Sequence, residues 1–98
     1  MNSLDGLIHQ RTRLRIMSAL AALEEGDEVE FTFLRDLLTL SDGNLSAHLQ
    51  KLEAAGYVAV EKTFIDRRPK TLIHLTPAGR EAFTSYVDTL EQIIHDEF

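Results

Sequence analysis

Residues 40–58 have the sequence LSDGNLSAHLQKLEAAGYV, and this stretch decides the fold. Ser41 can cap a helix because its hydroxyl accepts a hydrogen bond from a free N–H of the first turn, and Asp42 is favourable beside the positive helix start. Leucines recur on one face of this helix, at Leu45, Leu49 and Leu52. Gly56 ends it. The stretch therefore predicts a helix with one buried face and one polar face.

The polar face of this helix is small and suited to DNA. Asn44 and His48 can hydrogen-bond base edges, and Ala47 permits close approach or contacts a thymine methyl group. Three further residues can contact phosphates, namely Ser41, Ser46 and Lys51. A polar helix face is usually only solvated, so this prediction depends on the elements around it.

The segment after Gly56 predicts a β-hairpin. Residues 57–64 alternate well enough for one strand, and residues 71–75 are β-branched and apolar enough to return as the second. The predicted turn spans residues 66–69, a loop longer than the tight two-residue kind. Three cations lie at its tip, namely Arg67, Arg68 and Lys70. They are suited to phosphates or the minor groove, whereas on their own they would be equally consistent with a solvated turn.

Helices are predicted on both sides of these elements. Apolar spacing over residues 7–23 favours a helix with one buried face, closed near Gly26. A short extended piece follows at residues 29–31, and Thr32 can cap a brief helix as far as residue 38. Residues 76 and 77, Thr-Pro, begin the last helix, because threonine caps and proline is preorganised for the first helical position.

The order of elements and several motifs resemble MarR- and ArsR-type winged-helix regulators. The motifs lie in residues 13–17, 40–49, 51–58 and 75–80. The resemblance implies an α+β, mainly α, winged helix-turn-helix fold in one domain over residues 1–98. Its parts are a first helix (1–25), a helix-turn-helix (32–56), a two-stranded wing (57–75) and a long dimerisation helix (77–98). It also implies a dimeric repressor or activator whose third helix enters the major groove, with its wing on the flanking backbone.

The last helix carries an apolar stripe longer than a compact domain needs. The stripe consists of Phe83, Tyr86, Val87, Leu90, Ile93 and Ile94. We expect it to pair two chains about a two-fold axis, with a contribution from Leu4, Leu7 and Ile8 of the first helix. The sequence therefore predicts a homodimer.

Composition and charge limit the classes of function that the chain can have. The net charge of −6 opposes DNA binding, but residues 41–75 hold five basic and four acidic groups and lean positive. The absence of cysteine excludes disulfides and thiolate metal sites. The sequence shows no phosphate-binding glycine loop and no catalytic motif, so we expect neither an enzyme nor a cofactor. Apolar runs are too short for a membrane span, and we expect a cytoplasmic protein without membrane contact.

Two alternatives stay open beside a DNA-binding repressor. Winged helices also serve as protein-interaction modules. The negative net charge favours this alternative over DNA binding. A sensor could instead hold a small-molecule effector or a metal at the dimer interface, where Asp88, Glu91 and His95 could share a helix face. We predict no metal site, because two ligands one helical turn apart do not make one. Repression by promoter occlusion is favoured over activation, because little surface remains to recruit polymerase.

Overall fold

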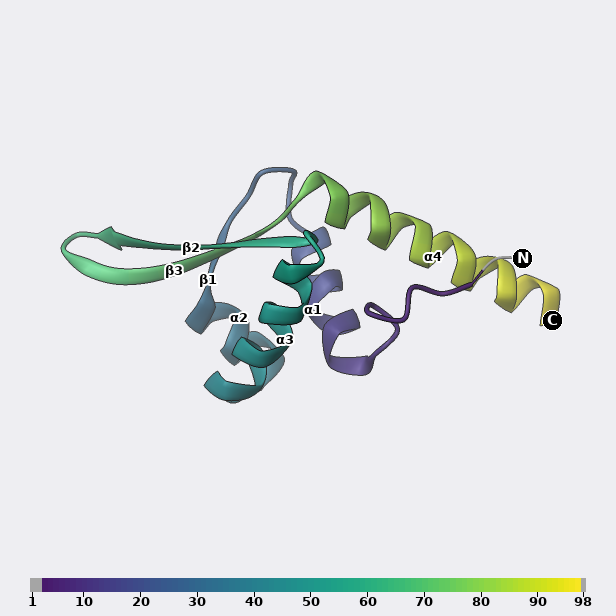
Figure 1. Cartoon of the computed structure of the whole chain (residues 1–98), viewed down its shortest axis with the longest axis horizontal. Coiled ribbons are helices and arrows are strands. Elements are labelled where there is room, and N and C mark those ends of the chain that lie inside the picture. Colours follow the sequence, from purple (N-terminus) through teal and green to yellow (C-terminus); the bar gives the residue numbers. More distant parts are fainter. Residues whose placement is uncertain (1–2, 98) are drawn as a thin grey trace.

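The computed structural model describes residues 3–97 and confirms the predicted winged helix fold (Figure 1). Met1, Asn2 and Phe98, which the predicted domain includes, lie outside the described residues. The elements in chain order are α1 (Arg11–Ala21), β1 (Val29–Glu30), α2 (Phe31–Leu38), α3 (Asp42–Ala54), β2 (Val58–Ile65), β3 (Arg68–Leu75) and α4 (Pro77–Glu97). Among residues 3–97, no helix combines the length and the apolar composition that crossing a membrane requires.

The sheet has three antiparallel strands in the order β1-β3-β2, which are the predicted short extended piece and the two strands of the predicted hairpin. The short strand β1 pairs only with Leu72 and Ile73 of β3. The hairpin of β2 and β3 extends beyond β1 as a two-stranded wing. At Pro69, therefore, β3 has a described neighbour on one side only, which is where a residue without an N–H group is tolerated in a strand.

The turn of the wing is tighter than predicted. Asp66 and Arg67 alone connect the strands, and both have positive φ angles, of 52° and 66°. Two such residues make the two-residue turn that matches the twist of a hairpin. Arg68 and Pro69 belong to β3, so the predicted loop over residues 66–69 was wrong.

The first helix is shorter than predicted, because residues 3–5 are irregular and residues 6–10 form a turn and a bend instead. The carboxylate of Asp5 accepts hydrogen bonds from the N–H groups of Leu7 at 2.9 Å and Ile8 at 3.3 Å. Aspartate side chains of this kind compete with helical hydrogen bonding. Helix α1 begins only after Gln10, whose side chain accepts from the N–H of Arg13 at 2.8 Å.

Two other predicted helix boundaries are also wrong. Gly26 has the predicted left-handed conformation, with a φ of 88°, but it lies in a turn beyond the end of α1 at Ala21. Thr32 does not cap α2. That helix begins at Phe31, two residues earlier than a cap at Thr32 implies, and its cap residue Glu30 makes no side-chain hydrogen bond.

The core draws on all four helices, the hairpin and the N-terminal turn. Its buried side chains are Ile8, Ile16, Met17, Leu20, Leu34, Leu38, Leu45, Leu49, Leu52, Val58, Ile73, Leu75 and Tyr86. Two of these were predicted at the dimer interface. Ile8 is 0% exposed and Tyr86 is 3% exposed, and the Tyr86 hydroxyl lies 2.8 Å from Nδ1 of His9. Both side chains are therefore enclosed by their own chain, which corrects that part of the prediction.

The junction between β3 and α4 fastens the last helix to the domain. Thr76 caps α4 by accepting from the N–H of Gly79 at 3.0 Å, and its hydroxyl donates to the carbonyl of Gly56. A side chain at residue 79 would collide with the carbonyl of Tyr57. Arg80 donates to the carbonyls of Ala21 and Leu23, at the end of α1. These contacts fix the direction in which α4 leaves the core.

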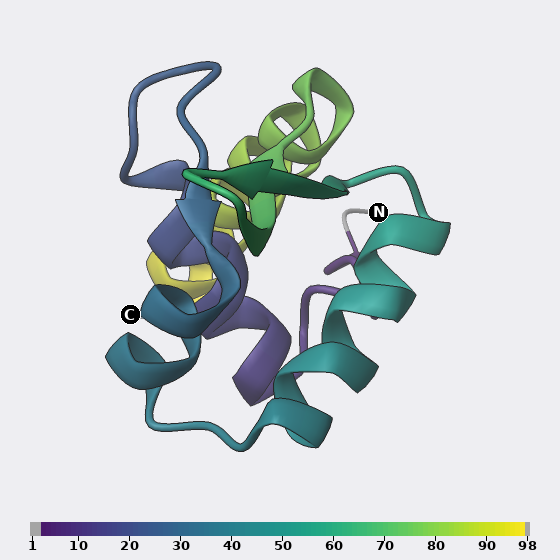
Figure 2. The ribbon, with the colours of Figure 1, turned by 90° about the vertical axis from the view of Figure 1, so that its left-hand side faces the viewer.

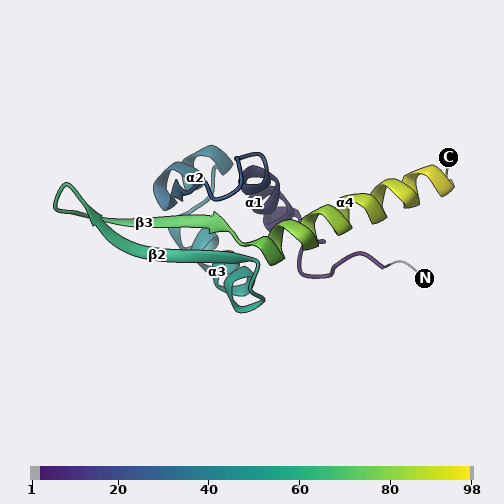
Figure 3. The ribbon, with the colours of Figure 1, turned by 90° about the horizontal axis from the view of Figure 1, so that it is seen from above.

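The wing and α4 project in opposite directions from the core, as Figures 1 and 3 show. The molecule accordingly measures 53 × 25 × 21 Å. Its long axis separates the predicted DNA-contacting hairpin from most of the predicted dimerisation helix.

Candidate nucleic-acid interface

Helix α3 turns its leucines inward and its polar residues outward, as predicted. Leu45, Leu49 and Leu52 are buried. The exposed side chains include Ser41, Asn44, Ser46, Ala47 and Lys51, whereas His48 is half-buried. Figure 2, which looks from the wing end, shows α3 at the edge of the domain with its outer side uncovered by the other described elements. The outer surface of α3 is therefore accessible to a large partner.

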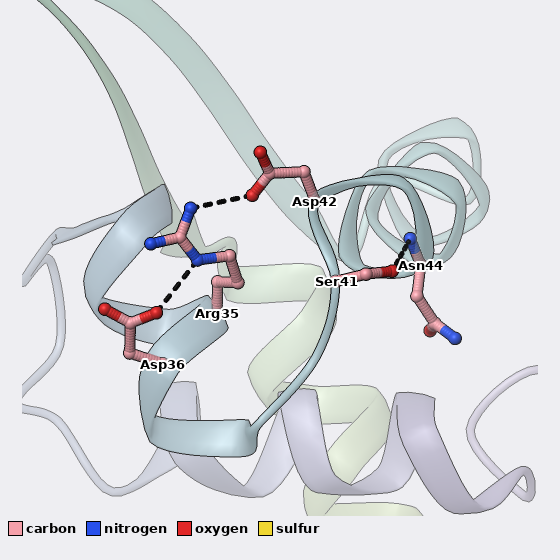
Figure 4. A network of polar contacts seen from close by, with 5 residues as sticks. All are labelled: Arg35, Asp36, Ser41, Asp42 and Asn44. Atoms are coloured by element: carbon pink, nitrogen blue, oxygen red, sulfur yellow. Dashed lines mark hydrogen bonds and ion pairs between the residues drawn. The ribbon is translucent and has the colours of Figure 1, made fainter.

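The turn between α2 and α3 is held by a small polar network (Figure 4). Ser41 caps α3 as predicted, since its Oγ accepts from the N–H of Asn44 at 3.1 Å. Arg35 donates to Asp36 at 2.9 Å and to Asp42 at 2.8 Å. Hydrogen bonds to these carboxylates, from Asp36 first, raise the pKa of Arg35. Sequence reasoning missed Arg35, which offsets two negative charges beside the candidate interface.

His48 lies on the α1 side of the outer surface and has a partner there. Arg13 donates from Nη1 to Nδ1 of His48 at 3.1 Å and from Nε to the carbonyl of Leu7 at 2.6 Å. Since a guanidinium has only donors, Nδ1 is the acceptor and the proton of neutral His48 sits on Nε2. Burial, together with the charges of Arg13 and Lys51, lowers the pKa of His48. At neutral pH the ring therefore offers a single N–H donor.

A groove of about 290 Å³ separates α3 from the hairpin. Its walls are Phe31, Ser46, Leu49, Gln50, Glu53, Val60, Lys62 and Thr71. The exposed carboxamide group of Gln50 belongs to the same outer surface as Ser46 and Ala47, and such a group can pair with adenine. Sequence reasoning missed Gln50, although it follows Ala47 and Ser46 by three and four residues, the spacing that places side chains on one helix face.

The three predicted wing cations separate into two groups. Arg67 lies in the turn and Arg68 starts β3, and both are exposed. Lys70 is not at the tip, contrary to the prediction. It lies further down β3, opposite Thr63, and its Nζ is 3.4 Å from the carboxylate of Glu30. Two cations are therefore available at the tip, and the third is partly neutralised.

The apolar stripe of α4 is smaller than predicted but still present. We call Phe83, Val87, Leu90, Ile93 and Ile94 the α4 stripe. Its first three members are half-buried, whereas Ile93 and Ile94 are 37% and 51% exposed. Leu4 and Leu7 are half-buried against the core. Among residues 3–97, no three histidine, aspartate or glutamate side chains form a cluster that could hold a metal ion.

Comparison with known proteins agrees with this geometry. Residues 12–94 match the family described as winged helix DNA-binding domain. The uncharacterized protein MJ0432 of Methanocaldococcus jannaschii is 42% identical over 81 residues, which cover 83% of this chain and 85% of that protein. The family match and the match to this relative thus each cover most of the chain.

Solved structures show the same fold. The transcriptional regulator homologue from Pyrococcus horikoshii OT3 has a TM-score of 0.83 and 29% identity, covering 92% of this chain and 86% of that one. A MarR family regulator from Neisseria meningitidis has a TM-score of 0.59 and 20% identity, covering 87% of this chain and 57% of that one. Both of these proteins are described as regulators. The chain therefore belongs to the winged helix DNA-binding domain family, and it shares its fold with a MarR family regulator.

Proposed function

We propose that this chain is a transcriptional regulator, a homodimer that binds an inverted-repeat operator and represses transcription by occluding the promoter. The observation that carries the proposal is the uncovered polar surface of α3 beside a wing with two exposed arginines. A major groove about 12 Å wide accepts one α-helix, and a projecting hairpin then reaches the flanking backbone.

In this proposal α3 supplies the sequence preference. Asn44 and Gln50 carry amide groups that pair with adenine, and His48 donates its Nε2 proton to an acceptor such as N7 or O6 of guanine. Ala47 lies between them and allows the helix backbone to approach the bases. The phosphate contacts come from Ser41, Ser46 and Lys51. Ser41 can cap α3 and contact a phosphate at the same time, because its oxygen accepts from the helix while its hydroxyl proton is free to be donated.

The wing supplies affinity in this proposal. Arg67 and Arg68 neutralise phosphates beside the major groove that α3 occupies, which is a sequence-independent and salt-dependent contribution. Lys70 contributes less, because Glu30 already neutralises part of its charge.

Dimerisation through the α4 stripe would relate two α3 helices by a two-fold axis. Burial of Ile93 and Ile94 removes the most exposed apolar side chains of α4 from water. Two recognition helices so related contact successive major grooves about 10 base pairs apart, or a multiple of that. Little surface remains for recruiting polymerase, which favours repression.

Selection of duplexes from a random DNA pool, using the whole chain, tests this function. We expect enrichment of an inverted repeat with half-sites about 10 base pairs apart or a multiple of that. A single unrepeated half-site contradicts the dimer, and no enrichment supports a protein-interaction module instead. On the selected site, Asn44→Ala should cost about 1–3 kcal/mol and relax preference at one base pair. Thr84→Ala, an exposed change on α4, is the matched control.

A second candidate role is control by a small-molecule effector. A cavity of about 450 Å³ lies between the N-terminal turn and α4, with Asp5, Tyr57 and Tyr86 in its wall. Burial alone would raise the pKa of Asp5, but hydrogen bonds from Tyr57, Leu7 and Ile8 lower it below its ordinary value. The carboxylate is thus ionised at neutral pH, which favours a cationic effector. Ligands that bind this cavity should change DNA affinity, and binding without such a change contradicts the role.

A further inference from the structure

The wing carries exposed apolar side chains that phosphate contacts do not explain. Phe64 is 73% exposed, the largest value among the exposed large apolar residues of the described chain, and Ile65 is 43% exposed. An aromatic side chain left in water near the end of a projecting hairpin is an aggregation hazard that proteins normally avoid. We therefore expect Phe64 to be covered by a binding partner.

The strand register shows which face of the wing Phe64 occupies. Phe64 lies opposite Pro69, and Ile65 lies opposite Arg68. Since side chains alternate along a strand, Phe64 shares its face with Val58, which is in the core, and with Lys62, which lines the groove beside α3. Phe64 and Pro69 thus lie on the α3 side of the wing, while Ile65 lies on the other face.

The charge around Phe64 matches DNA. Residues 62–70 contain four basic groups and one acidic group, Asp66, whereas the whole chain has a net charge of −6. Lys62 shares the face of Phe64, Arg67 lies in the exposed turn beyond it, and Arg68 is exposed on the opposite face beside Ile65. An apolar side chain flanked by cations fits the minor groove, whose walls are deoxyribose carbons and whose rims are phosphates.

We propose that Phe64, backed by Pro69, packs against the deoxyribose walls of the minor groove next to the major groove that α3 occupies. This inference rests on the proposed DNA binding and adds a contact of a different kind. Because the contact is apolar, it contributes affinity that salt does not screen. Because it spans the groove walls, it favours flanking sequences with a narrow minor groove, such as A-tracts.

The test measures binding of the whole chain to the selected duplex by fluorescence anisotropy at several salt concentrations. The duplex is prepared with A-tract flanks and with G·C flanks. We expect Phe64→Ala to weaken binding to the A-tract duplex roughly tenfold, as removal of a buried aromatic side chain implies, with no change in salt slope. The preference for A-tract flanks should disappear. Phe64→Leu should restore most of the affinity.

Ile65→Ala is the matched control, because Ile65 is the exposed apolar neighbour on the opposite face of the hairpin. It should leave affinity and flank preference unchanged. The inference is overturned if Phe64→Ala binds as the parent does, if Ile65→Ala weakens binding equally, or if the weaker binding comes with a reduced salt slope. A change in oligomeric state of Phe64→Ala without DNA would instead assign Phe64 to a second copy. If the parent binds no duplex, the proposed function itself fails.

Discussion

The two ends of this elongated molecule carry similar apolar groups in opposite electrostatic settings. The wing exposes Phe64 and Ile65, and the far end of α4 exposes Ile93 and Ile94. Residues 62–70 hold four basic groups and one acidic group, whereas residues 76–98 hold one basic and five acidic groups. The surrounding charge thus distinguishes a surface suited to DNA from a surface that DNA repels. We infer that it also sets the orientation on the duplex, with α4 directed away from the phosphates.

The largest expected effect comes from breaking the α4 end. The double change Ile93→Asp and Ile94→Asp should convert the dimer to a monomer, because it places charge in the proposed apolar interface. Affinity for the inverted repeat should then fall by about a hundredfold or more, since the second half-site no longer binds at high effective concentration. Light scattering at micromolar concentration and anisotropy measure the two effects.

Leu37→Asp is the control for that change, because Leu37 is an exposed apolar residue on α2 that is 56% accessible, against 37% and 51% for Ile93 and Ile94. It should leave the dimer intact. Cutting the chain after Tyr86 should also give monomers. A dimer that persists in the double variant would remove the α4 stripe from the interface.

The next largest effect is a loss of stability at the junction between β3 and α4, which connects the wing to the last helix. Gly79→Ala should destabilise the fold by about 1–3 kcal/mol, because the added methyl group collides with the Tyr57 carbonyl and forces the backbone to shift. Gly43→Ala is the control, since a methyl group there contacts nothing within 4 Å and favours the helix. Urea unfolding compares the two variants. Equal stabilities would show that the junction adapts without cost.

A smaller effect is expected on the salt dependence of DNA affinity, which tests the electrostatic difference between the two ends. Arg67→Ala with Arg68→Ala should reduce the slope of log affinity against log salt by roughly 0.9 for each phosphate that is no longer neutralised. Dimerisation should be unaffected, and added salt should not weaken it, because both α4 helices are acidic. An unchanged salt slope and affinity in a normally folded double variant would leave the hairpin with a structural role only.

The smallest effect concerns His48 and is seen through pH. Because burial and nearby positive charge lower its pKa in the folded chain, the unfolded chain binds more protons below about pH 6.5. The contribution of His48 to stability is therefore complete above that pH and declines as the pH falls through the folded pKa. Arg13→Gln should raise the pKa of His48, measured by NMR titration of the ring. A fall or no change would mean that Arg13 does not act on the ring.

Local signals made much of this fold predictable. The caps at Ser41 and Thr76 each bond an N–H three residues away, and the leucine face of α3 follows from helical spacing. Such patterns span only a few residues, so they can be recognised in a short segment of sequence. The outer surface of α3 and the exposed wing arginines followed from the same reasoning.

Contacts between distant segments could not be predicted in this way. Arg13 bonds His48 across 35 positions, and Lys70 bonds Glu30 across 40. Tyr86 resembled a residue of the α4 stripe until its contact with His9, 77 positions away, was known. The periodicity of a helix shows that a face is apolar. It does not show whether that face is covered by the same chain or by a partner.

The central claim is that one end of the molecule binds DNA and the other does not. NMR titration of the whole chain with its selected duplex, following backbone amide shifts, tests it most directly. We predict the largest shifts in residues 41–51 of α3 and residues 62–70 of the wing, with residues 88–96 of α4 unchanged. Shifts concentrated on α4, or a wing and α3 that do not respond to a bound duplex, would contradict the account.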